Sequence, residues 1–228
     1  MAIRLTATSS QDIRRTANLL TGRTAYTWMA WMYPLSVTAW GTVLYLGSAT
    51  ECADADVFYV SGGARINMRS YLATAEELAV TGTTPLSAST WYHVALVRTA
   101  TDLLVYLDGA VECTGANSYL DRTTAGINCC GVRNGSQFYF DGRFAAIKQW
   151  QAALNVTEIA AEIGKYKPQR AGDLHLWSPC FAGDPERLKD YSANGYNWTA
   201  TGTLTDEADP PALNWAAEAP PKKIMVLP

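Results

Sequence analysis

The sequence predicts an all-β fold, a β-sandwich or jelly roll with one short helix near residues 156–163. Short runs of β-branched and aromatic residues recur along the chain, and turn-forming Gly, Pro, Asn and Asp residues separate them. Only one stretch has both a start and a stop signal for a helix. The chain has 228 residues, which fits one all-β sandwich, since such domains run to roughly 250 residues.

The first expected strand, residues 26–33 (YTWMAWMY), is rich in aromatic residues and stops at Pro34. Both of its alternating faces are largely apolar, so we expect a central strand that is covered on both sides. Further strands are expected at 42–46, at 57–60 and, across a Gly62-Gly63 turn, at 65–69.

A hairpin is the clearest feature of the middle of the chain. Residues 91–98 and 103–107 flank a short polar loop, and Asp108-Gly109 offers a tight turn after them. Later strands are expected at 138–142, 146–150 and 174–177.

The expected helix begins after Asn155, which can cap its first turn. Glu158, three residues on, completes a capping-box pattern, and Gly164 is a natural stop. The sequence therefore predicts a helix over 156–163.

The composition changes from residue 206 onward. Pro210-Pro211 and Pro220-Pro221 bracket a segment that cannot lie inside a sheet. We therefore expect one domain over residues 1–205 and an extended, Pro-rich C-terminal tail over residues 206–228.

Several segments, taken in order, carry a resemblance to a known family. They are the strand 26–34 (YTWMAWMYP), the hairpin from Trp91 to Gly109, the Phe140-Asp141-Gly142 run with Trp150 and the helix after it, and the run 190–195 (DYSANG) after Trp177. They resemble a laminin-G-like domain of the concanavalin A-like lectin/glucanase superfamily, in its non-catalytic branch. The resemblance implies a two-sheet antiparallel jelly-roll sandwich with a curved outer face and loops at one rim.

The chain departs from this family at Phe144-Ala145-Ala146, where members often carry Ile-Asp-Glu. We therefore carry over no polar or calcium-binding role at that strand.

Charge and hydropathy exclude two classes of partner. The chain has 18 Lys and Arg against 21 Asp and Glu, without a basic cluster, so we expect no nucleic acid partner. No stretch of about 18 apolar residues occurs, so we expect no membrane insertion. The N-terminal residues lack the apolar region of a signal peptide, and the five cysteines show no zinc-site spacing. We expect free thiols and synthesis in a cytoplasm.

A glycoside hydrolase is the catalytic alternative. The glucanase branch of the superfamily uses a Glu-x-Asp-x-x-Glu-like run, whose acids lie on one face of a strand. This chain has no such run, because Glu76 and Glu77 are adjacent and would point to opposite faces. His93, which a Ser-His-Asp set could use, lies inside the hairpin pattern, where we expect a structural role. We expect no catalytic residues and no enzyme activity.

We expect no required cofactor, and calcium is the one ion we consider. Laminin-G-like relatives often bind Ca²⁺ at the loop rim through carboxylates and backbone carbonyls. The candidate acids of this chain are scattered, and turn formation is the usual role of such aspartates. As metal ligands the sequence offers Asp54, Asp56 and Asp121.

Carbohydrate is the ligand that we favour. Aromatic rings stack on the C–H faces of sugar rings, and a shallow site of this kind needs only exposed rings on a rigid sheet. Core packing is the competing role for every aromatic residue of a sandwich. Trp31 and Tyr33 fall on the opposite strand face from Trp28, and Trp40 lies in a loop. The candidate ligand-binding residues are Trp31, Tyr33, Trp40, Tyr59 and Tyr139.

The setting that we favour is the virion surface of a bacteriophage, where an adhesion module binds a host-surface polysaccharide. The apolar residues 224–227 follow Pro220-Pro221 and two lysines, which favours docking on other virion proteins and a homo-oligomer. The alternative is a purely structural subunit that decorates a capsid or tail without binding sugar.

Overall fold

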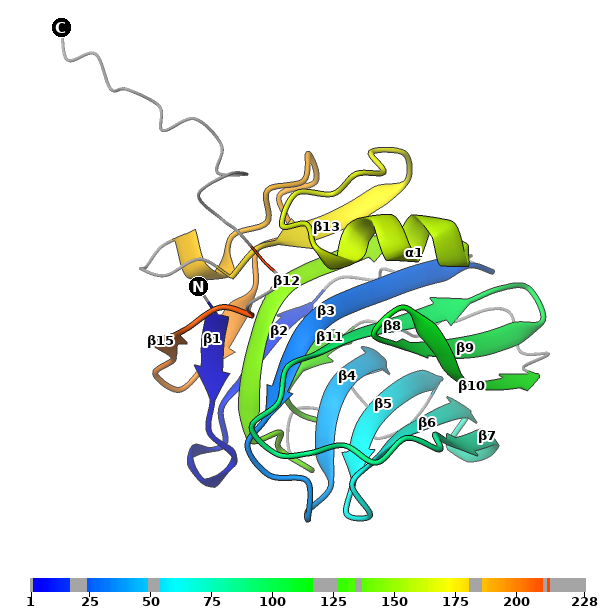
Figure 1. Cartoon of the computed structure of the whole chain (residues 1–228), viewed down its shortest axis with the longest axis horizontal. Helices are drawn as coiled ribbons and strands as arrows, with labels where there is room; N and C mark the ends of the chain where they lie inside the picture. Colours follow the sequence, from blue (N-terminus) through cyan, green and yellow to red (C-terminus); the bar gives the residue numbers. More distant parts are fainter. Residues whose placement is uncertain are drawn as a thin grey trace, which may run out of the picture.

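The chain folds into two antiparallel sheets that pack face to face, with an α-helix on the outside (Figure 1). The computed structural model describes residues 2–16, 24–48, 54–116, 127–133, 137–180, 186–210 and 213. This architecture confirms the predicted jelly-roll sandwich. No helix in this described part has the length and apolar character needed to cross a membrane.

Sheet A is the larger sheet, and β3 and β12 lie at its centre. Its strand order is β10 (Ala110–Ala116), β9 (Asp102–Leu107), β8 (Tyr92–Arg98), β3 (Tyr26–Pro34), β12 (Gly142–Trp150), β1 (Ala2–Leu5) and β15 (Thr205–Glu207), with β13 (Leu174–Ser178) also paired to β12. The strand predicted to be central, β3, has neighbours on both sides, as expected.

Sheet B has seven strands in the part of the chain that the structure describes. Their order is β14 (Thr199–Thr201), β2 (Asp12–Thr16), β11 (Ile127–Cys130), β4 (Gly41–Gly47), β5 (Ala55–Ser61), β6 (Arg65–Leu72) and β7 (Ala75–Thr81). The helical elements are η1 (Ala7–Ser9), α1 (Val156–Ile163) and η2 (Glu186–Leu188).

The C-terminal part of the chain begins in the sheet rather than as a free tail. Strand β15 crosses the domain boundary expected at residue 205, because Thr205–Glu207 pairs with β1. Leu213 is also buried, against Trp31 and Ala145 on the outer face of sheet A. The other residues from 211 onward lie outside the described ones.

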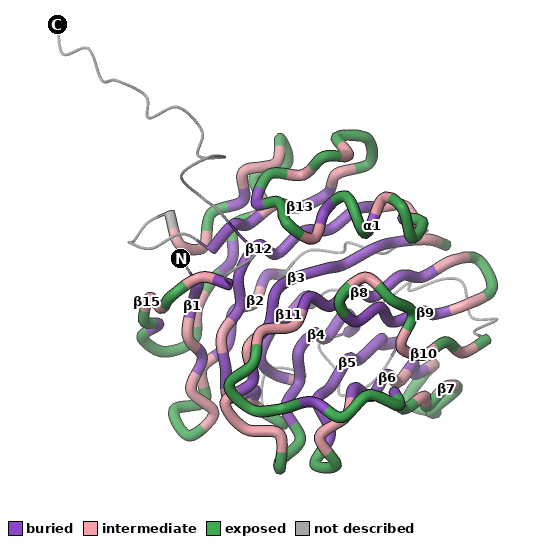
Figure 2. Tube along the Cα trace, in the orientation of Figure 1, coloured by how far each residue is buried: buried purple, intermediate pink, exposed green. Residues whose placement is uncertain are grey.

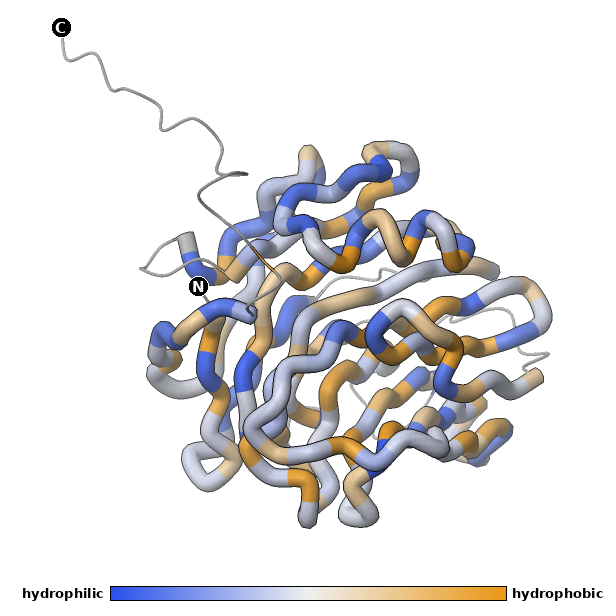
Figure 3. Tube along the Cα trace, viewed as in Figure 1, coloured by the Kyte–Doolittle hydropathy of each residue, from blue (hydrophilic) through white to orange (hydrophobic). Residues whose placement is uncertain are grey.

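The space between the sheets is an apolar core. Trp28 of β3, Phe58 of β5, Leu96 of β8 and Phe144 of β12 meet there and expose no surface. Because successive strand residues point to opposite faces, Tyr59, next to Phe58, faces outward. Figure 2 shows buried residues along the strands of both sheets, and Figure 3 shows hydrophobic residues gathered on the same strands.

A buried ion pair links the two sheets at one end of this core. Asp56 of β5 receives a hydrogen bond of 2.8 Å from Arg98 of β8, and both side chains are almost fully buried. Tyr26 Oη of β3 donates to the same carboxylate at 2.8 Å, and Ser70 Oγ of β6 donates at 2.7 Å. One carboxylate therefore holds two strands of sheet A and a neighbouring strand of sheet B.

Helix α1 is capped as the sequence predicts. The Asn155 side chain accepts hydrogen bonds from the backbone N–H groups of Thr157 and Glu158, both at 3.0 Å. The Glu158 carboxylate in turn accepts the Asn155 N–H at 2.9 Å, which completes the capping box.

A second buried ion pair fixes α1 on the outer face of sheet A. Lys148 Nζ of β12 lies 2.7 Å from the Glu162 carboxylate and also donates to the Lys165 carbonyl at 2.6 Å. The indole N–H of Trp31 donates to the Ile163 carbonyl at 2.9 Å. The helix thus covers Trp31, leaving it only 8% exposed.

We expect Asp56→Asn to lower the free energy of unfolding by about 3–5 kcal/mol, because it leaves the buried Arg98 without a counter-charge. Urea unfolding measures the change. Asp173→Asn is the matched control, since its pair with Arg170 is largely exposed and should cost less than about 1 kcal/mol. Equal losses for the two variants would contradict a stabilising role for the inter-sheet pair.

We also expect stability to fall in acid through His93, which packs edge-on against Trp31 at 5.5 Å. Burial, and secondly the charge of Lys148, lowers the pKa of His93 to about 3. The unfolded chain takes up this proton near pH 6.5 and the folded chain does not, so stability is lost as pH falls from 6.5 towards 3.

The free energy of unfolding of the His93→Phe variant should therefore fall less steeply with pH, by up to about 1.4 kcal/mol per pH unit in that window. Unfolding measured at a series of pH values tests this. The free energies of unfolding of the parent and the variant should differ by a constant amount between pH 7 and 9. A difference that also stays constant below pH 6 would show that His93 is not the group responsible.

Candidate ligand-binding site

The outer face of sheet B carries a second layer of aromatic side chains. Tyr45 of β4, Tyr59 of β5 and Tyr71 of β6 face outward and pack together with Cys129 of β11. Tyr139, from the segment that follows β11, packs against this layer and is half-buried. The layer forms the floor on which a surface site is built.

A pocket of about 140 Å³ opens on this face. Its walls come from the loop before β4, from β5 and β6, and from the segment after β11. The lining residues are Trp40, Tyr59, Arg69, Tyr71, Arg133 and Phe138.

Three aromatic rings shape the pocket. Tyr59 lies at its base and is 2% exposed, whereas Trp40 and Phe138 are 38% and 40% exposed. The Tyr59 ring stands edge-on to both others, with centroids 5.4 Å from Trp40 and 6.1 Å from Phe138. This packing fixes the two outer rings while leaving part of each open to solvent.

The backbone at Phe138 adopts a conformation that bulky residues rarely take. Its φ is +51°, in the left-handed region. The Thr42 N–H donates to the Phe138 carbonyl at 2.8 Å, and Phe140 N–H donates to the Gly131 carbonyl at 2.8 Å. These bonds hold the segment against β4 and place the Phe138 ring at the pocket. Strain retained in this way is a frequent feature of binding sites.

Residues 138–142 are therefore not the strand expected from their aromatic content. Strand β12 begins only at Gly142, and the preceding residues run beside β4, with Phe138 at the outer pocket and Phe140 in the core between the sheets. The left-handed turn at Phe138 brings its ring beside Trp40. The β-forming residues of this segment predict a strand and give no sign of the turn.

Two guanidinium groups complete the walls. Arg133 stacks on Phe138 with its central carbon 4.7 Å from the ring centroid, and Arg69 lies 5.6 Å from the centroid of Trp40. Arg133 also donates to the Gln137 side chain at 2.6 Å. Arg69 is ion-paired with Glu76 at the edge of the sheet.

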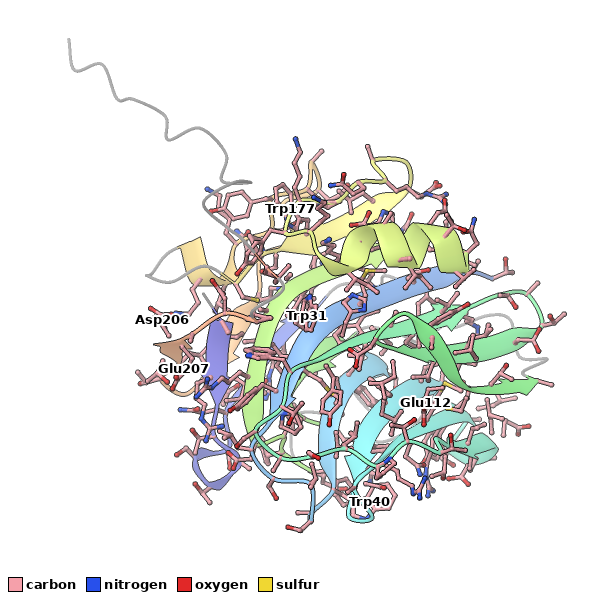
Figure 4. The ribbon with its side chains drawn as sticks, viewed as in Figure 1. Trp31, Trp40, Glu112, Trp177, Asp206 and Glu207 are labelled. Atoms are coloured by element: carbon pink, nitrogen blue, oxygen red, sulfur yellow. The ribbon has the colours of Figure 1, made fainter. Side chains whose placement is uncertain are left out.

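The structure divides the predicted ligand-binding residues between two faces. Trp40 and Tyr59 meet in the pocket, and Tyr139 packs in the layer beneath that face. Trp31 and Tyr33 lie on β3 of the other sheet, and Figure 4 shows Trp31 far from Trp40. Tyr33 packs against Trp91 and under Arg143, and is half-buried.

Four lining residues were not among the candidates. They are Arg69, Tyr71, Arg133 and Phe138. Alternation along β6 could have placed the first two on one face with Tyr59, because β5 and β6 form an expected hairpin. The last two depend on the turn after β11, for which the sequence offers no short-range signal.

Neither of the two predicted metal ligands that the structure describes, Asp54 and Asp56, lines the pocket. Asp56 is held in the inter-sheet ion pair, and Asp54 accepts the backbone N–H of Ala73 at 3.1 Å. Asp121 lies outside the described residues. Within those residues, no group of three or more His, Cys, Asp and Glu side chains is placed to hold a metal ion.

The described lining of the pocket contains no carboxylate, imidazole or thiol that could act as a general acid, base or nucleophile. The nearby Cys129 thiol is buried beneath the aromatic layer, and burial raises its pKa to about 12. The arrangement offers stacking surfaces and hydrogen-bond donors, which suits binding.

Three solved structures illustrate the fold. A candidate carbohydrate-binding protein from Bacteroides ovatus matches with a TM-score of 0.69 and 17% identity over 90% of this chain and 59% of its own. The heptameric SAP-like pentraxin of Limulus polyphemus matches with a TM-score of 0.61 and 14% identity, over 90% of this chain and 93% of its own. The CBM40 domain of a Ruminococcus gnavus sialidase, bound to α2,3-sialyllactose, matches with a TM-score of 0.56 and 14% identity, over 70% of this chain and 95% of its own.

The chain thus spans about three-fifths of the Bacteroides ovatus protein. No curated protein matches it by sequence. The family model that describes concanavalin A-like lectins and glucanases matches residues 7–160, more than half of the sequence. The chain belongs to the concanavalin A-like lectin/glucanase superfamily.

Proposed function

We propose that the chain is a non-catalytic module that binds carbohydrate in the pocket between Trp40 and Phe138. The observation that carries this proposal is the exposure of these two rings. Only four large apolar side chains in the described part of the chain are classed as exposed, and two of them line this one pocket. Exposed apolar surface gathered in one place on a soluble domain is a mark of a binding site.

The chemistry of the walls supports a sugar ligand. The ring faces of Trp40 and Phe138 can stack on the C–H groups of a sugar, while the Arg69 and Arg133 side chains donate hydrogen bonds to its oxygens. A volume of about 140 Å³ is smaller than the roughly 300 Å³ of a pocket that encloses a drug-sized molecule. The site therefore suits one sugar residue or a chain end more than an enclosed oligosaccharide.

The likeness to carbohydrate-binding structures supports the same proposal. The Bacteroides ovatus protein and the CBM40 domain share this fold, and the second was solved with a sialylated sugar bound. The absence of a carboxylate, imidazole or thiol from the described lining supports a module without catalysis.

We further propose that the module acts on the surface of a bacteriophage particle, with a host-surface polysaccharide as its ligand. The apolar run at residues 224–227, after Pro220-Pro221, supports docking of the C-terminal segment on other virion proteins or on a second copy. Calcium remains a proposed addition at the loop rim.

The test is a glycan-array screen of the purified chain, with calcium and with a chelator, followed by titration of the best ligand. We expect saturable binding that Trp40→Ala weakens at least about tenfold, because the exposed indole supplies the stacking surface. Tyr33→Ala is the matched aromatic control on sheet A and should bind as the parent does.

Loss of binding in Tyr33→Ala but not in Trp40→Ala would move the site to sheet A. No binding to any glycan at high protein concentration would refute the carbohydrate proposal and favour the structural subunit. Glycan binding that is present with calcium and absent with the chelator would identify a calcium-dependent lectin.

A further inference from the structure

We propose that the ligand is an acidic sugar, a residue with a carboxylate or sulfate group, and that its negative charge lies between Arg69 and Arg133. This inference rests on the proposed function and specifies the chemical class of the ligand in the same pocket.

The charge of the pocket differs in sign from that of the whole protein. The chain carries a net charge of −3, yet the only charged side chains that line this pocket in the described structure are Arg69 and Arg133. Glu76 of β7 pairs with Arg69 but does not line the pocket.

Both arginines are held in place before any ligand arrives. The Arg133 guanidinium stacks on Phe138, donates to Gln137 at 2.6 Å, and lies 3.4 Å from the Tyr59 hydroxyl. Arg69 projects from β6 at 5.6 Å from the Trp40 ring centroid. Guanidinium groups that are already fixed lose little side-chain entropy when they bind an anion.

Arg69 also has hydrogen-bonding capacity that the described structure does not use. Its Nε atom is buried and has no hydrogen-bond partner among the described residues, although Nη1 is paired with Glu76. A buried donor without an acceptor costs free energy, and a charged oxygen is the acceptor that satisfies it best. A neutral sugar offers hydroxyl groups, which accept a weaker hydrogen bond from the same atom.

The aromatic rings and the guanidinium groups can act on one ligand together. Trp40 and Phe138 each have an arginine beside them, and Tyr59 lies between the two rings at the base. A sugar ring that stacks against either wall brings a substituent close to a guanidinium. The arrangement thus selects for a ligand that is apolar on one face and anionic at its edge.

The experiment compares acidic and neutral probes that share a carbohydrate skeleton. The pairs are 3′-sialyllactose with lactose, polygalacturonate with its fully methyl-esterified form, and dextran sulfate with dextran, together with every hit from the array. We expect the acidic member of a binding pair to bind at least about tenfold more tightly, and its affinity to fall as salt is raised.

Variants then assign the effect to the pocket. Arg69→Gln and Arg133→Gln should each weaken binding of the acidic probe about tenfold or more, and should weaken any neutral probe clearly less, because a neutral sugar accepts only the weaker hydrogen bond. Arg170→Gln, in an exposed ion pair beside α1, alters the net charge equally and should have no effect. Arg69→Lys keeps the charge, and a melting curve for each variant checks that it is folded.

The outcomes separate this inference from the proposed function. Equal binding of acidic and neutral probes, lost in Trp40→Ala, overturns the acidic ligand and keeps the carbohydrate site. If Arg170→Gln weakens binding of the acidic probe as much as the two pocket variants do, the cause is general charge attraction. That result also overturns the acidic ligand. No binding by any probe or array glycan overturns both proposals.

Discussion

The carboxylate of Asp56 sits on the inner face of sheet B, where it accepts hydrogen bonds from Arg98 and Tyr26 of sheet A. The pair is almost wholly buried, so a shift in register between the sheets would leave each charge buried without its partner. Fixing Asp56 inward also fixes the alternation of β5. Tyr59, three residues on, then lies on the outer face, as does Arg69, whose neighbour Ser70 binds the same carboxylate. The geometry of the pocket follows from this constraint.

The two outer faces of the sandwich have different roles because they are covered differently. On sheet A, the Lys148–Glu162 pair anchors α1, and Leu213 packs beside Trp31. On sheet B, the described residues leave Trp40 and Phe138 partly open above a buried tyrosine layer. An aromatic residue on the first face serves packing, while the two exposed rings on the second are available to a ligand. The same residue type thus has two roles, decided by what covers it.

The fold was predictable because its signals are local. Alternation and aromatic content identified β3 and the β8–β9 hairpin, and the capping pattern at Asn155 located α1 at the residues observed. The site was predictable only in part. Trp40 was a candidate by its position in a loop and Tyr59 by its residue type, but the sequence gives no measure of which sheet a strand joins. Trp31 and Tyr33 therefore entered the same list from the opposite face.

The residues that were missed depend on tertiary geometry. Phe138 reaches the pocket through a left-handed backbone turn, which hydrogen bonds to distant residues maintain. Arg133 is positioned by stacking on that ring. Likewise, Asp56 could pass for a metal ligand until the structure placed Arg98, 42 positions away in sequence, against it. Pairings at such separations leave no pattern in a single sequence.

The most direct test is an NMR titration that follows the indole N–H signals of the tryptophan residues while a glycan that binds the chain is added. A ligand in the pocket should shift the Trp40 signal saturably, because that ring is exposed at the wall. The Trp31 signal should stay in place, since its N–H is bonded to Ile163 beneath α1. A saturable shift of Trp31 with Trp40 unmoved would contradict the assignment of the binding face to sheet B.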